Sequence, residues 1–483
     1  MNEVRFTIIV HAHDTDPSLF RKMIESIKDI NYKNFELIII DSNQVTVLPS
    51  LIAEIMPGDG RVVYRKARLM NEAEAFNAGL RLMSGDYCLF LGQYDMPSPA
   101  LFEEIERLCI SSLLPEHKDI DFDTLTKAAS GDRLRLWKRT APGLIYTDYD
   151  EIIDDTRMNP HFYGAFSPEL LCQSYYFNRA FVISLELLRR VGTFDINYTY
   201  GHIYDYLLRI LDEWKKNKNS SESRIRIYHL PGLYYHLLKR TYNFSGLKKI
   251  NKDKYTDLRR AALSYLRRNG IKRKLSNEPE SEVWAYEREN KEDNIRKNDY
   301  ILMKDDDVRV NAFPKALADM YSFIREKDVA VVGGKFVNKG RIINCGFIYD
   351  DQGFIYPACS GYDAGDRGYE NRISLTQDVS MVDPSFCLID ARIYRRLGGF
   401  NSGLLARDAM LDFCLRAISR GYRIVYDANV TARKNEIYNG SSESSHNKLL
   451  EYYGDNGTSM IRFSDGDRYY NPNLKMGVTN YYI

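Results

Sequence analysis

The first part of the chain alternates between short apolar runs and amphipathic stretches, and this pattern constrains the fold more than any other feature. The apolar runs cover residues 6–10, 35–40, 61–64 and 87–91, and the first three contain several β-branched residues, as is typical of buried parallel strands. The stretches between them carry apolar residues at helical spacing, as in residues 20–30. Since parallel strands need crossover connections, the alternation predicts a doubly wound α/β domain, with a mostly parallel sheet flanked by helices.

Asp41 directly follows the second predicted strand, at the edge of the sheet where α/β proteins hold their ligands. A carboxylate at this position can accept hydrogen bonds from a ribose or from a nucleobase N–H. A second interpretation is equally open, because Asp41 begins the polar turn Asp41-Ser42-Asn43 and an aspartate often caps such a turn. The sequence makes Asp41 a candidate nucleotide ligand without excluding a local role.

Three segments of the chain recur later, in the same order and at nearly the same spacing. Such repetition indicates two related domains. The aligned pairs are GDYCLFLGQYD (85–95) with NDYILMKDDDV (298–308), LLRRVGTFD (187–195) with IYRRLGGFN (393–401), and YDYLLRI (204–210) with LDFCLRA (411–417).

The second copy is shorter than the first. The counterpart of residues 1–85 should fall at 214–298, but the first domain still occupies that interval to about residue 250. The remainder has no room for two strand–helix units. We therefore predict a first domain at residues 1–270 and a truncated second domain at residues 271–483, which lacks the half of the fold that holds a nucleotide.

The formal net charge of +1 argues against a broad nucleic-acid-binding face, which would need an excess of basic residues. No apolar run approaches the roughly 20 residues that span a bilayer, and the N-terminal residues MNEVRFTIIV predict a strand rather than a signal peptide. The seven cysteines are scattered and include no Cys-x-x-Cys pair, as expected of a reduced protein. We expect a cytoplasmic protein that binds no nucleic acid, with a peripheral contact at the inner face of the membrane left open.

A series of longer motifs extends along most of the chain: FTIIVHAHDTDPSLFRKMIESIKDINYKNFELIIIDSN (6–43), NEAEAFNAGLRLMSGDYCLFL (71–91), LIYTDYDEI (144–152), PHFYGAFSPELL (160–171), IYHLPGLYYHLLKR (227–240) and DRYYNPNL (467–474). Their order and spacing resemble the family-two inverting glycosyltransferases, which have the GT-A fold. The last motif resembles the branch that builds bacterial O-antigen and other cell-surface polysaccharides. The resemblance implies a GT-A-like first domain and a truncated second GT-A-like domain. It also implies hexosyl transfer from a nucleotide-sugar donor to a polysaccharide, glycan or lipid-linked acceptor.

The resemblance also implies roles for single residues. In this family an Asp-x-Asp after the fourth strand holds Mn²⁺ or Mg²⁺, which stabilises the pyrophosphate leaving group. These positions align with Gly92 and Tyr94, which carry no carboxylate, so a divalent cation would have to be held in another way or be absent. The family's general base aligns with Ile203, which is no base either. The remaining catalytic candidates are Asp95, Asp148 and His202, and the nucleotide-binding candidates are Asp41, Lys66, Asn71 and His236.

Several of these candidates have plainer structural interpretations. Asp95 can be a turn or helix-capping residue before Pro97, and His202 and His236 can be packing residues. Asp148 shares its segment with Asp150, and this pair matches a family pattern beside the acceptor site.

The second domain shows the opposite pattern of losses. Asp305 and Asp307 fill the Asp-x-Asp positions after a predicted strand and are candidate metal ligands, although adjacent acids on a loop are often only solvated. Its base position aligns with Met410, and Arg433-Lys434 lies near the place of a family histidine, where cations could offset phosphate charge.

Three functions follow from these patterns. The favoured one is glycosyl transfer in the first domain. The alternative is a catalytically inactive relative that acts as a binding or scaffold subunit. A third is a composite site in which Asp305 and Asp307 complete the nucleotide pocket of the other domain.

Overall fold

The computed structural model describes residues 4–111, 141–217, 225–238, 244–276, 282–288, 296–434, 443–459 and 461–476. The chain divides into two compact units. The first unit comprises Met1–Tyr163, Phe177–Gly270 and Pro279–Glu282, and the second comprises Gly164–Tyr176, Ile271–Glu278 and Val283–Ile483.

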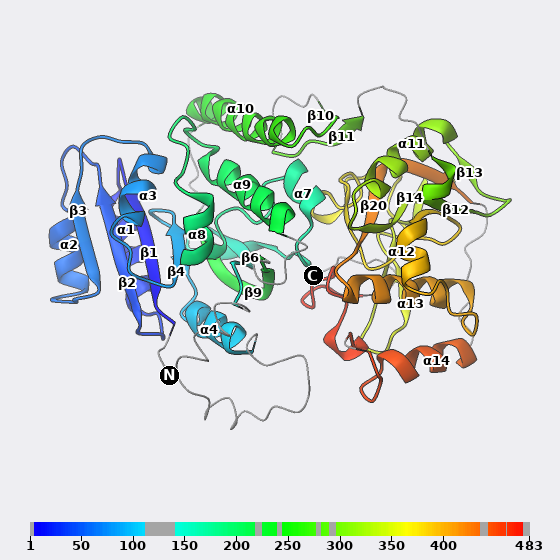
Figure 1. The fold of residues 1–483 in the computed structure, drawn as a ribbon. Helices are drawn as coiled ribbons and strands as arrows, with labels where there is room; N and C mark the ends of the chain where they lie inside the picture. Colours follow the sequence, from blue (N-terminus) through cyan, green and yellow to red (C-terminus); the bar gives the residue numbers. More distant parts are fainter. Residues whose placement is uncertain are drawn as a thin grey trace. The chain divides into compact units, whose positions relative to one another are not determined.

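The first half of the first unit is a parallel sheet with helical crossovers, as the sequence predicts. Its strands lie in the order β3-β2-β1-β4, and all neighbours in this row are parallel (Figure 1). The strands β1 and β2 are buried along their whole length, which explains their nearly continuous apolar sequences. The elements are β1 (Phe6–Ala12), α1 (Pro17–Lys28), β2 (Phe35–Asp41), α2 (Leu48–Ile55), β3 (Val62–Lys66), α3 (Glu72–Leu80) and β4 (Tyr87–Leu91).

The second half of this sheet has mixed strand directions. The order continues β4-β8-β6-β9-β5, with β8 antiparallel to both of its neighbours and β6 parallel to β9. The predicted α/β class is confirmed. Apolar periodicity does not encode the direction of β8, because direction depends on how the chain enters the sheet. The elements are β5 (Met96–Pro97), α4 (Leu101–Ser111), β6 (Leu144–Ile153), β7 (Thr156–His161), β8 (Phe181–Ser184), α8 (Leu185–Val191), α9 (His202–Asn217), β9 (Ile227–Leu238) and α10 (Phe244–Arg268).

The sheet of the second unit repeats the second half of the first. Its order is β12-β19-β14-β20-β13, in the same chain sequence as β4-β8-β6-β9-β5. The first aligned pair of segments contains β4 and β12, the second overlaps α8 and α12, and the third lies in α9 and α13. Among the described residues, no strand equivalent to β1, β2 or β3 joins this sheet.

The elements of the second unit, in chain order, are α7 (Pro168–Gln173), β10 (Arg273–Leu275), β11 (Tyr286–Arg288), η1 (Lys297–Asp299), β12 (Tyr300–Lys304), β13 (Arg309–Val310), α11 (Phe313–Ile324), β14 (Val329–Asn338), β15 (Arg341–Asn344), β16 (Phe347–Tyr349), β17 (Ile355–Pro357), η2 (Tyr369–Asn371), β18 (Gln377–Asp378), β19 (Phe386–Asp390), α12 (Ala391–Arg396), α13 (Ala406–Ser419), β20 (Arg423–Arg433), α14 (Glu443–Tyr453) and η3 (Phe463–Asp465).

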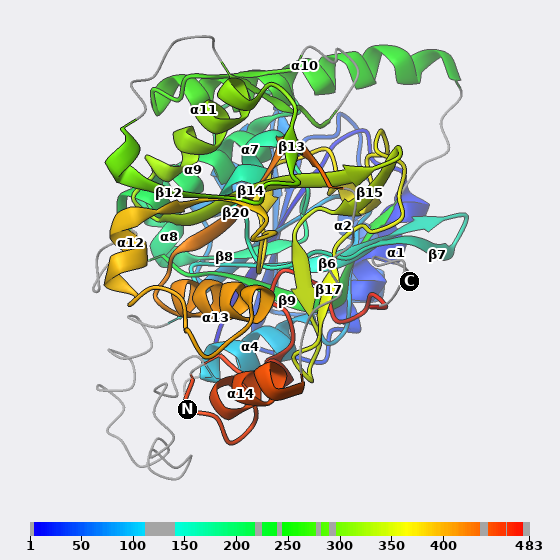
Figure 2. The ribbon, with the colours of Figure 1, turned by 90° about the vertical axis from the view of Figure 1, so that its right-hand side faces the viewer.

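Helices cover both faces of the second sheet, with α11 on one face and α13 on the other (Figure 2). Successive side chains of β14 point to opposite faces of the sheet, because side chains alternate along a strand. Val331 belongs to the core cluster that includes Phe413 of α13, and Val332 belongs to the cluster that includes Met320 of α11. The truncated copy therefore has apolar cores of its own.

A buried arginine joins α7 to the rest of the second unit. The guanidinium of Arg423 forms ion pairs with Glu169 of α7 at 3.2 Å and with Asp378 at 3.1 Å. Arg273 lies 3.1 Å from the other oxygen of Glu169. Because burying one member of such a network alone is costly, these pairs hold the segment Gly164–Tyr176 in the second unit, although it lies between β7 and β8 in sequence.

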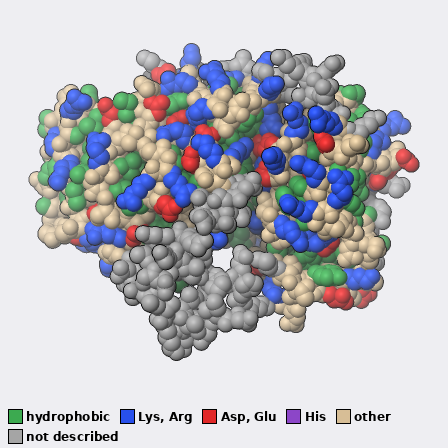
Figure 3. All heavy atoms as spheres, viewed as in Figure 1, with side chains coloured by type: hydrophobic (Ala, Val, Ile, Leu, Met, Phe, Trp, Pro, Cys, Tyr) green, Lys and Arg blue, Asp and Glu red, His purple; other side chains and the backbone are tan. Residues whose placement is uncertain are grey.

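Among the residues that the structure describes, no helix combines the length and the apolar character needed to cross a bilayer. On the face shown in Figure 3, Lys and Arg side chains lie among Asp, Glu and uncharged side chains.

Candidate functional site

Asp41 ends β2 at the carboxyl edge of the parallel strands and is fully buried. Its Oδ1 accepts hydrogen bonds from the backbone N–H and the side-chain amide of Asn43, both at 2.8 Å. The hydroxyl of Tyr64 on β3 donates to Oδ2 at 2.5 Å, and Lys66 Nζ lies 3.4 Å from Oδ1. The predicted turn contact is therefore present, and the carboxylate also lies at the edge where a ligand would bind.

The surroundings keep Asp41 ionised. Burial raises the pKa of the Asp41 carboxyl, but hydrogen bonds from Tyr64, Thr46 and Asn43 together bring the pKa below its ordinary value. Burial and the adjacent carboxylate raise the pKa of Tyr64 to about 12, so the phenol stays a donor. The Lys66 side chain is 43% exposed and carries an ammonium beside this anion. Such a pair can accept a nucleoside N–H or O–H and attract a phosphate.

The loop after β4 is tied to the loop after β1 by neutral side chains. Gln93 Oε1 accepts hydrogen bonds from the His13 backbone N–H at 3.1 Å and from the Thr15 hydroxyl at 2.9 Å. Gln93 Nε2 donates to the His13 carbonyl at 2.9 Å. The Tyr94 hydroxyl accepts from the Asp16 backbone N–H at 2.9 Å. Gln93 and Tyr94 therefore connect the loop after β4 to the loop after β1, at the positions where the family's Asp-x-Asp would lie.

Asp95 points into the protein and back over Gly92. It accepts hydrogen bonds from the Tyr235 hydroxyl at 2.6 Å and from the Leu238 backbone N–H at 3.2 Å, and its residue is 6% exposed. A Cβ atom at Gly92 would lie 2.3 Å from Asp95 Oδ2. Burial raises the pKa of the Asp95 carboxyl. The Asp95 carboxylate therefore occupies the space that a side chain at position 92 would need.

These contacts bear on the divalent cation that the resemblance implies. Gly92 and Tyr94 supply no carboxylate, and Asp95 is turned towards Tyr235 instead of towards the loop surface. In the described part of the chain, no group of three or more His, Cys, Asp and Glu side chains is arranged to hold a metal ion. The loop after β4 therefore does not fit a metal site of the Asp-x-Asp kind, which needs oxygen ligands at these positions.

His202 belongs to an ionic cluster that the sequence analysis did not identify. Glu72, in the first turn of α3, forms a bidentate pair with Arg179 at 2.6 and 3.0 Å. His202 Nε2 lies 3.1 Å from Glu72 Oε2, and the imidazole, 1% exposed, contacts the ring of Phe76. Burial raises the pKa of Glu72, but Arg179 and His202 together hold that pKa well below its usual range. Glu72 shows no distinguishing signal in the sequence, because acids are common in first turns of helices.

Two carboxylates of β6 are each paired with a histidine of β9. Asp148 accepts from His229 at 2.8 Å and from two backbone N–H groups at 2.9 and 3.0 Å. Asp150 pairs with His236 at 2.6 Å and with Arg157 at 2.7 Å. Burial raises the pKa of Asp150, but these two partners bring it below its ordinary value. The structure brings the predicted residues Asp150 and His236 together.

Asn71 is the N-terminal cap of α3. Its side-chain oxygen accepts from the Glu74 backbone N–H at 2.9 Å, and its amide donates to the Ile196 carbonyl at 2.9 Å. Glu74 completes a capping box by accepting from the Asn71 backbone N–H at 2.9 Å. These contacts use both ends of the Asn71 amide.

In the second unit, a lysine lies beside the acid cluster. Lys434 Nζ is 2.9 Å from Asp305 Oδ2 and 3.8 Å from Asp307 Oδ1, and it donates to the Ser385 hydroxyl at 3.0 Å. Burial lowers the pKa of Lys434, but the carboxylates of Asp305 and Asp307 raise it above its ordinary value. An ammonium therefore lies where a cation between the two carboxylates would bind.

Comparisons with known proteins match the N-terminal part of the first unit to a family. Residues 7–109 match the family model described as Glycosyl transferase family 2. A protein of Sinorhizobium fredii described as uncharacterised, y4gI, is 22% identical over 97% of this chain and 57% of its own length. The O-antigen biosynthesis protein RfbC of Myxococcus xanthus is 23% identical over 48% of this chain and 15% of its own length. The chain thus spans less than two thirds of either relative.

Solved structures give weaker matches. Staphylococcus aureus TarS 1–349 in complex with UDP-GlcNAc is 13% identical, with a TM-score of 0.36 over 54% of this chain and 66% of that chain. The mannosyltransferase PcManGT of Pyrobaculum calidifontis, in complex with GDP-Man and Mn²⁺, is 15% identical, with a TM-score of 0.35 over 55% of this chain and 65% of that chain. At these scores the likeness says nothing about the ligands of this chain.

Proposed function

Residues 7–109 belong to glycosyl transferase family 2, and on that premise we propose that this protein transfers a hexosyl group from a nucleotide-sugar donor to a glycan or lipid-linked acceptor. The observation that carries the proposal is the buried, ionised Asp41 beside Lys66 at the carboxyl edge of the parallel strands. The relative RfbC, named for O-antigen biosynthesis, supports a role in bacterial surface polysaccharide synthesis.

On the donor side, the nucleoside would bind over Asp41 and the diphosphate would lie towards Lys66. The exposed ammonium of Lys66 can offset part of the charge that develops on the leaving pyrophosphate. His236 and Asn71 are proposed to line this region, although each is already hydrogen-bonded within the protein. The loop after β4 does not fit the family's metal ligands, so no step of the proposal depends on a divalent cation.

On the acceptor side, we propose a transfer that inverts the configuration at the anomeric carbon, which requires one direct displacement. The acceptor oxygen bonds to the anomeric carbon, the bond from that carbon to the pyrophosphate oxygen breaks, and a base takes the acceptor proton. We propose Asp95 as the first candidate for this base, because it lies in the loop that follows β4, with Asp148 and His202 as the others. The raised pKa of Asp95 suits a group that holds a proton, whereas the backbone contacts of Asp148 favour a supporting role.

Calorimetric titration with UDP, GDP, CDP and dTDP, each with and without Mn²⁺, tests the donor side. We expect one nucleotide to bind without Mn²⁺ and Asp41→Asn to abolish the binding. The matched control is Asp59→Asn, since Asp59 pairs with Arg61 near the start of β3, at the other end of that strand from Lys66. If none of the four nucleotides binds the wild-type protein, the proposal is wrong.

A second function is favoured by one specific observation, which is that every catalytic candidate is engaged within the protein. Asp95, Asp148 and His202 are each buried and paired. A protein of this kind could bind a nucleotide sugar as a scaffold subunit without transferring it. Release of free nucleoside diphosphate from the bound donor, measured with extracted lipid-linked glycans as acceptors, separates the two functions. Binding without release at any acceptor concentration would establish the scaffold.

A further inference from the structure

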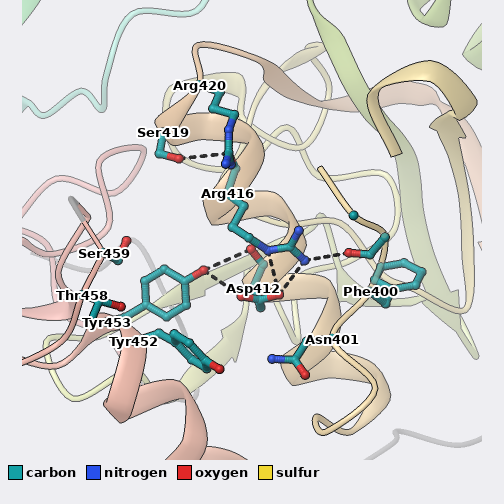
Figure 4. A pocket seen from close by; sticks show the side chains of 12 residues that line it. Phe400, Asn401, Asp412, Arg416, Ser419, Arg420, Tyr452, Tyr453, Thr458 and Ser459 are labelled. Atoms are coloured by element: carbon teal, nitrogen blue, oxygen red, sulfur yellow. Dashed lines mark hydrogen bonds and ion pairs between the residues drawn. The ribbon is translucent and has the colours of Figure 1, made fainter. Parts of the chain in front are cut away.

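The second unit contains a pocket of about 580 Å³, formed by α13, α14 and the loop that follows α12 (Figure 4). This volume lies in the range of small-molecule binding sites. The pocket lies in the truncated copy, which has no strands equivalent to β1, β2 and β3 among the described residues, so a role in donor binding does not account for it.

The inner wall of the pocket is closed by a saturated ionic group. Arg416 Nη2 lies 2.6 Å from Asp412 Oδ2, and Arg416 also donates to the carbonyls of Leu397 and Gly399 at 2.6 and 2.8 Å. The Tyr453 hydroxyl donates to Asp412 Oδ1 at 2.8 Å. Figure 4 shows the contacts among Asp412, Arg416 and Tyr453 near the centre of the view. Arg416 and Asp412 carry opposite charges and are paired with each other, so they shape the pocket but offer a ligand no unpaired charge.

The outer wall carries groups that are still open to a ligand. Tyr452 is 43% exposed. Arg420 is exposed, and its guanidinium makes a 3.4 Å hydrogen bond to the Arg416 carbonyl. No described carboxylate lies within ion-pair distance of this guanidinium. Asn401 adds the N–H groups of its amide, since its Oδ1 accepts from the Gly403 backbone N–H at 3.0 Å, and Thr458 adds a hydroxyl. The rim therefore offers one aromatic face, neutral hydrogen-bonding groups and one guanidinium without a carboxylate partner.

The equivalent ion pair of the first unit has different surroundings. This pair, Arg209 and Asp205, lies at 2.9 Å, close to the Arg416–Asp412 distance. There the second oxygen of Asp205 faces Arg268 at 3.5 Å. Arg268 belongs to α10, a helix of 25 residues that packs along α9, whereas α14 has 11 residues. The pocket of the second unit is therefore lined by a shorter helix, α14, than the helix that packs along α9 in the first unit.

We propose that this pocket binds an acidic sugar unit of a glycan. The Tyr452 ring would stack on the apolar face of the sugar, as aromatic side chains with one exposed face do. Arg420 would form a charge-assisted pair with the sugar carboxylate, for which a guanidinium has matching geometry. Asn401 and Thr458 would bond to the sugar hydroxyls. This site is separate from the proposed transfer reaction, and it would hold the glycan non-catalytically.

The test is a titration of the full chain with trigalacturonate and with maltotriose, a neutral trisaccharide, followed by calorimetry or ligand-observed NMR. We expect trigalacturonate to bind, and maltotriose to bind about tenfold more weakly because it lacks the carboxylate. Arg420→Ala and Tyr452→Ala should each weaken trigalacturonate binding about tenfold. Tyr452→Phe should retain it, because the ring face remains.

The matched control is Arg395→Ala, which removes another exposed arginine of the second unit, on α12, that does not line the pocket. It should leave binding unchanged. Melting curves check folding, which the substitutions at the exposed Arg420 and Tyr452 should not affect. Absence of saturable trigalacturonate binding, or binding that neither alanine variant weakens, would overturn the site, and equal affinity for maltotriose would overturn its acidic class. Nucleotide titrations of the first unit report independently on the proposed transfer.

Discussion

Replacing Gly92 by alanine should destabilise the first unit through Asp95. The new Cβ would lie 2.3 Å from Asp95 Oδ2 and 2.9 Å from its Cγ, closer than atoms approach in folded proteins. The carboxylate must therefore move away from Tyr235 and Leu238, which now donate to it at 2.6 and 3.2 Å. A buried hydrogen bond to a charged group contributes about 1.5–3 kcal/mol, so losing both costs roughly 3–6 kcal/mol.

Urea denaturation followed by circular dichroism measures this cost for the transition that unfolds the first unit. The control is the same change in an Asp95→Ala background, where the steric conflict is absent and Gly92→Ala should cost less than about 1 kcal/mol. Equal costs in the two backgrounds would refute the reasoning, and so would a Gly92→Ala protein as stable as the wild type. Either result would show that Asp95 is not held over Gly92.

Three further predictions follow from the described contacts. Placing aspartates at both Asp-x-Asp positions, with Gly92→Asp and Tyr94→Asp, should destabilise the protein and create no Mn²⁺ affinity. The new side chain at position 92 would collide with Asp95, and the loss of Tyr94 would remove the hydrogen bond from the Asp16 backbone N–H. Mn²⁺ titration followed by electron paramagnetic resonance checks this, and tight binding would contradict it. Lys434→Met should allow Asp305 and Asp307 to bind Tb³⁺, detected by luminescence. The wild type should not bind Tb³⁺, since the Lys434 ammonium lies beside both carboxylates. Equal signals from the two proteins would show that Lys434 does not occupy the place of a metal cation. Burial raises the pKa of Asp467 to about 6, so its stabilising contribution is fully present below pH ~4 and is lost as pH rises through ~6. The stability of Asp467→Asn relative to wild type should therefore rise by about 2 kcal/mol from pH 4 to pH 7 in denaturation experiments, and a flat difference would contradict the shift.

Local sequence patterns predicted the architecture of the parallel half well. Continuous apolar runs indicated β1, β2 and β4, because both faces of a central parallel strand are buried. The repeated segments indicated that two sets of elements share one arrangement, and the order β12-β19-β14-β20-β13 repeats β4-β8-β6-β9-β5. The direction of β8 was beyond such patterns, since burial is alike in parallel and antiparallel strands.

The candidate site was predicted only as a set of residue types at strand ends. The sequence alone determined that Gly92 and Tyr94 bring no carboxylate to the loop after β4 and that Asp41 ends a buried strand. Only the tertiary structure decided that Asp95 turns inward and that Lys434 lies beside Asp305. The reason is physical: a residue's backbone position follows from the local apolar period, whereas its hydrogen-bond partner comes from a distant segment that folding brings within 3 Å or so.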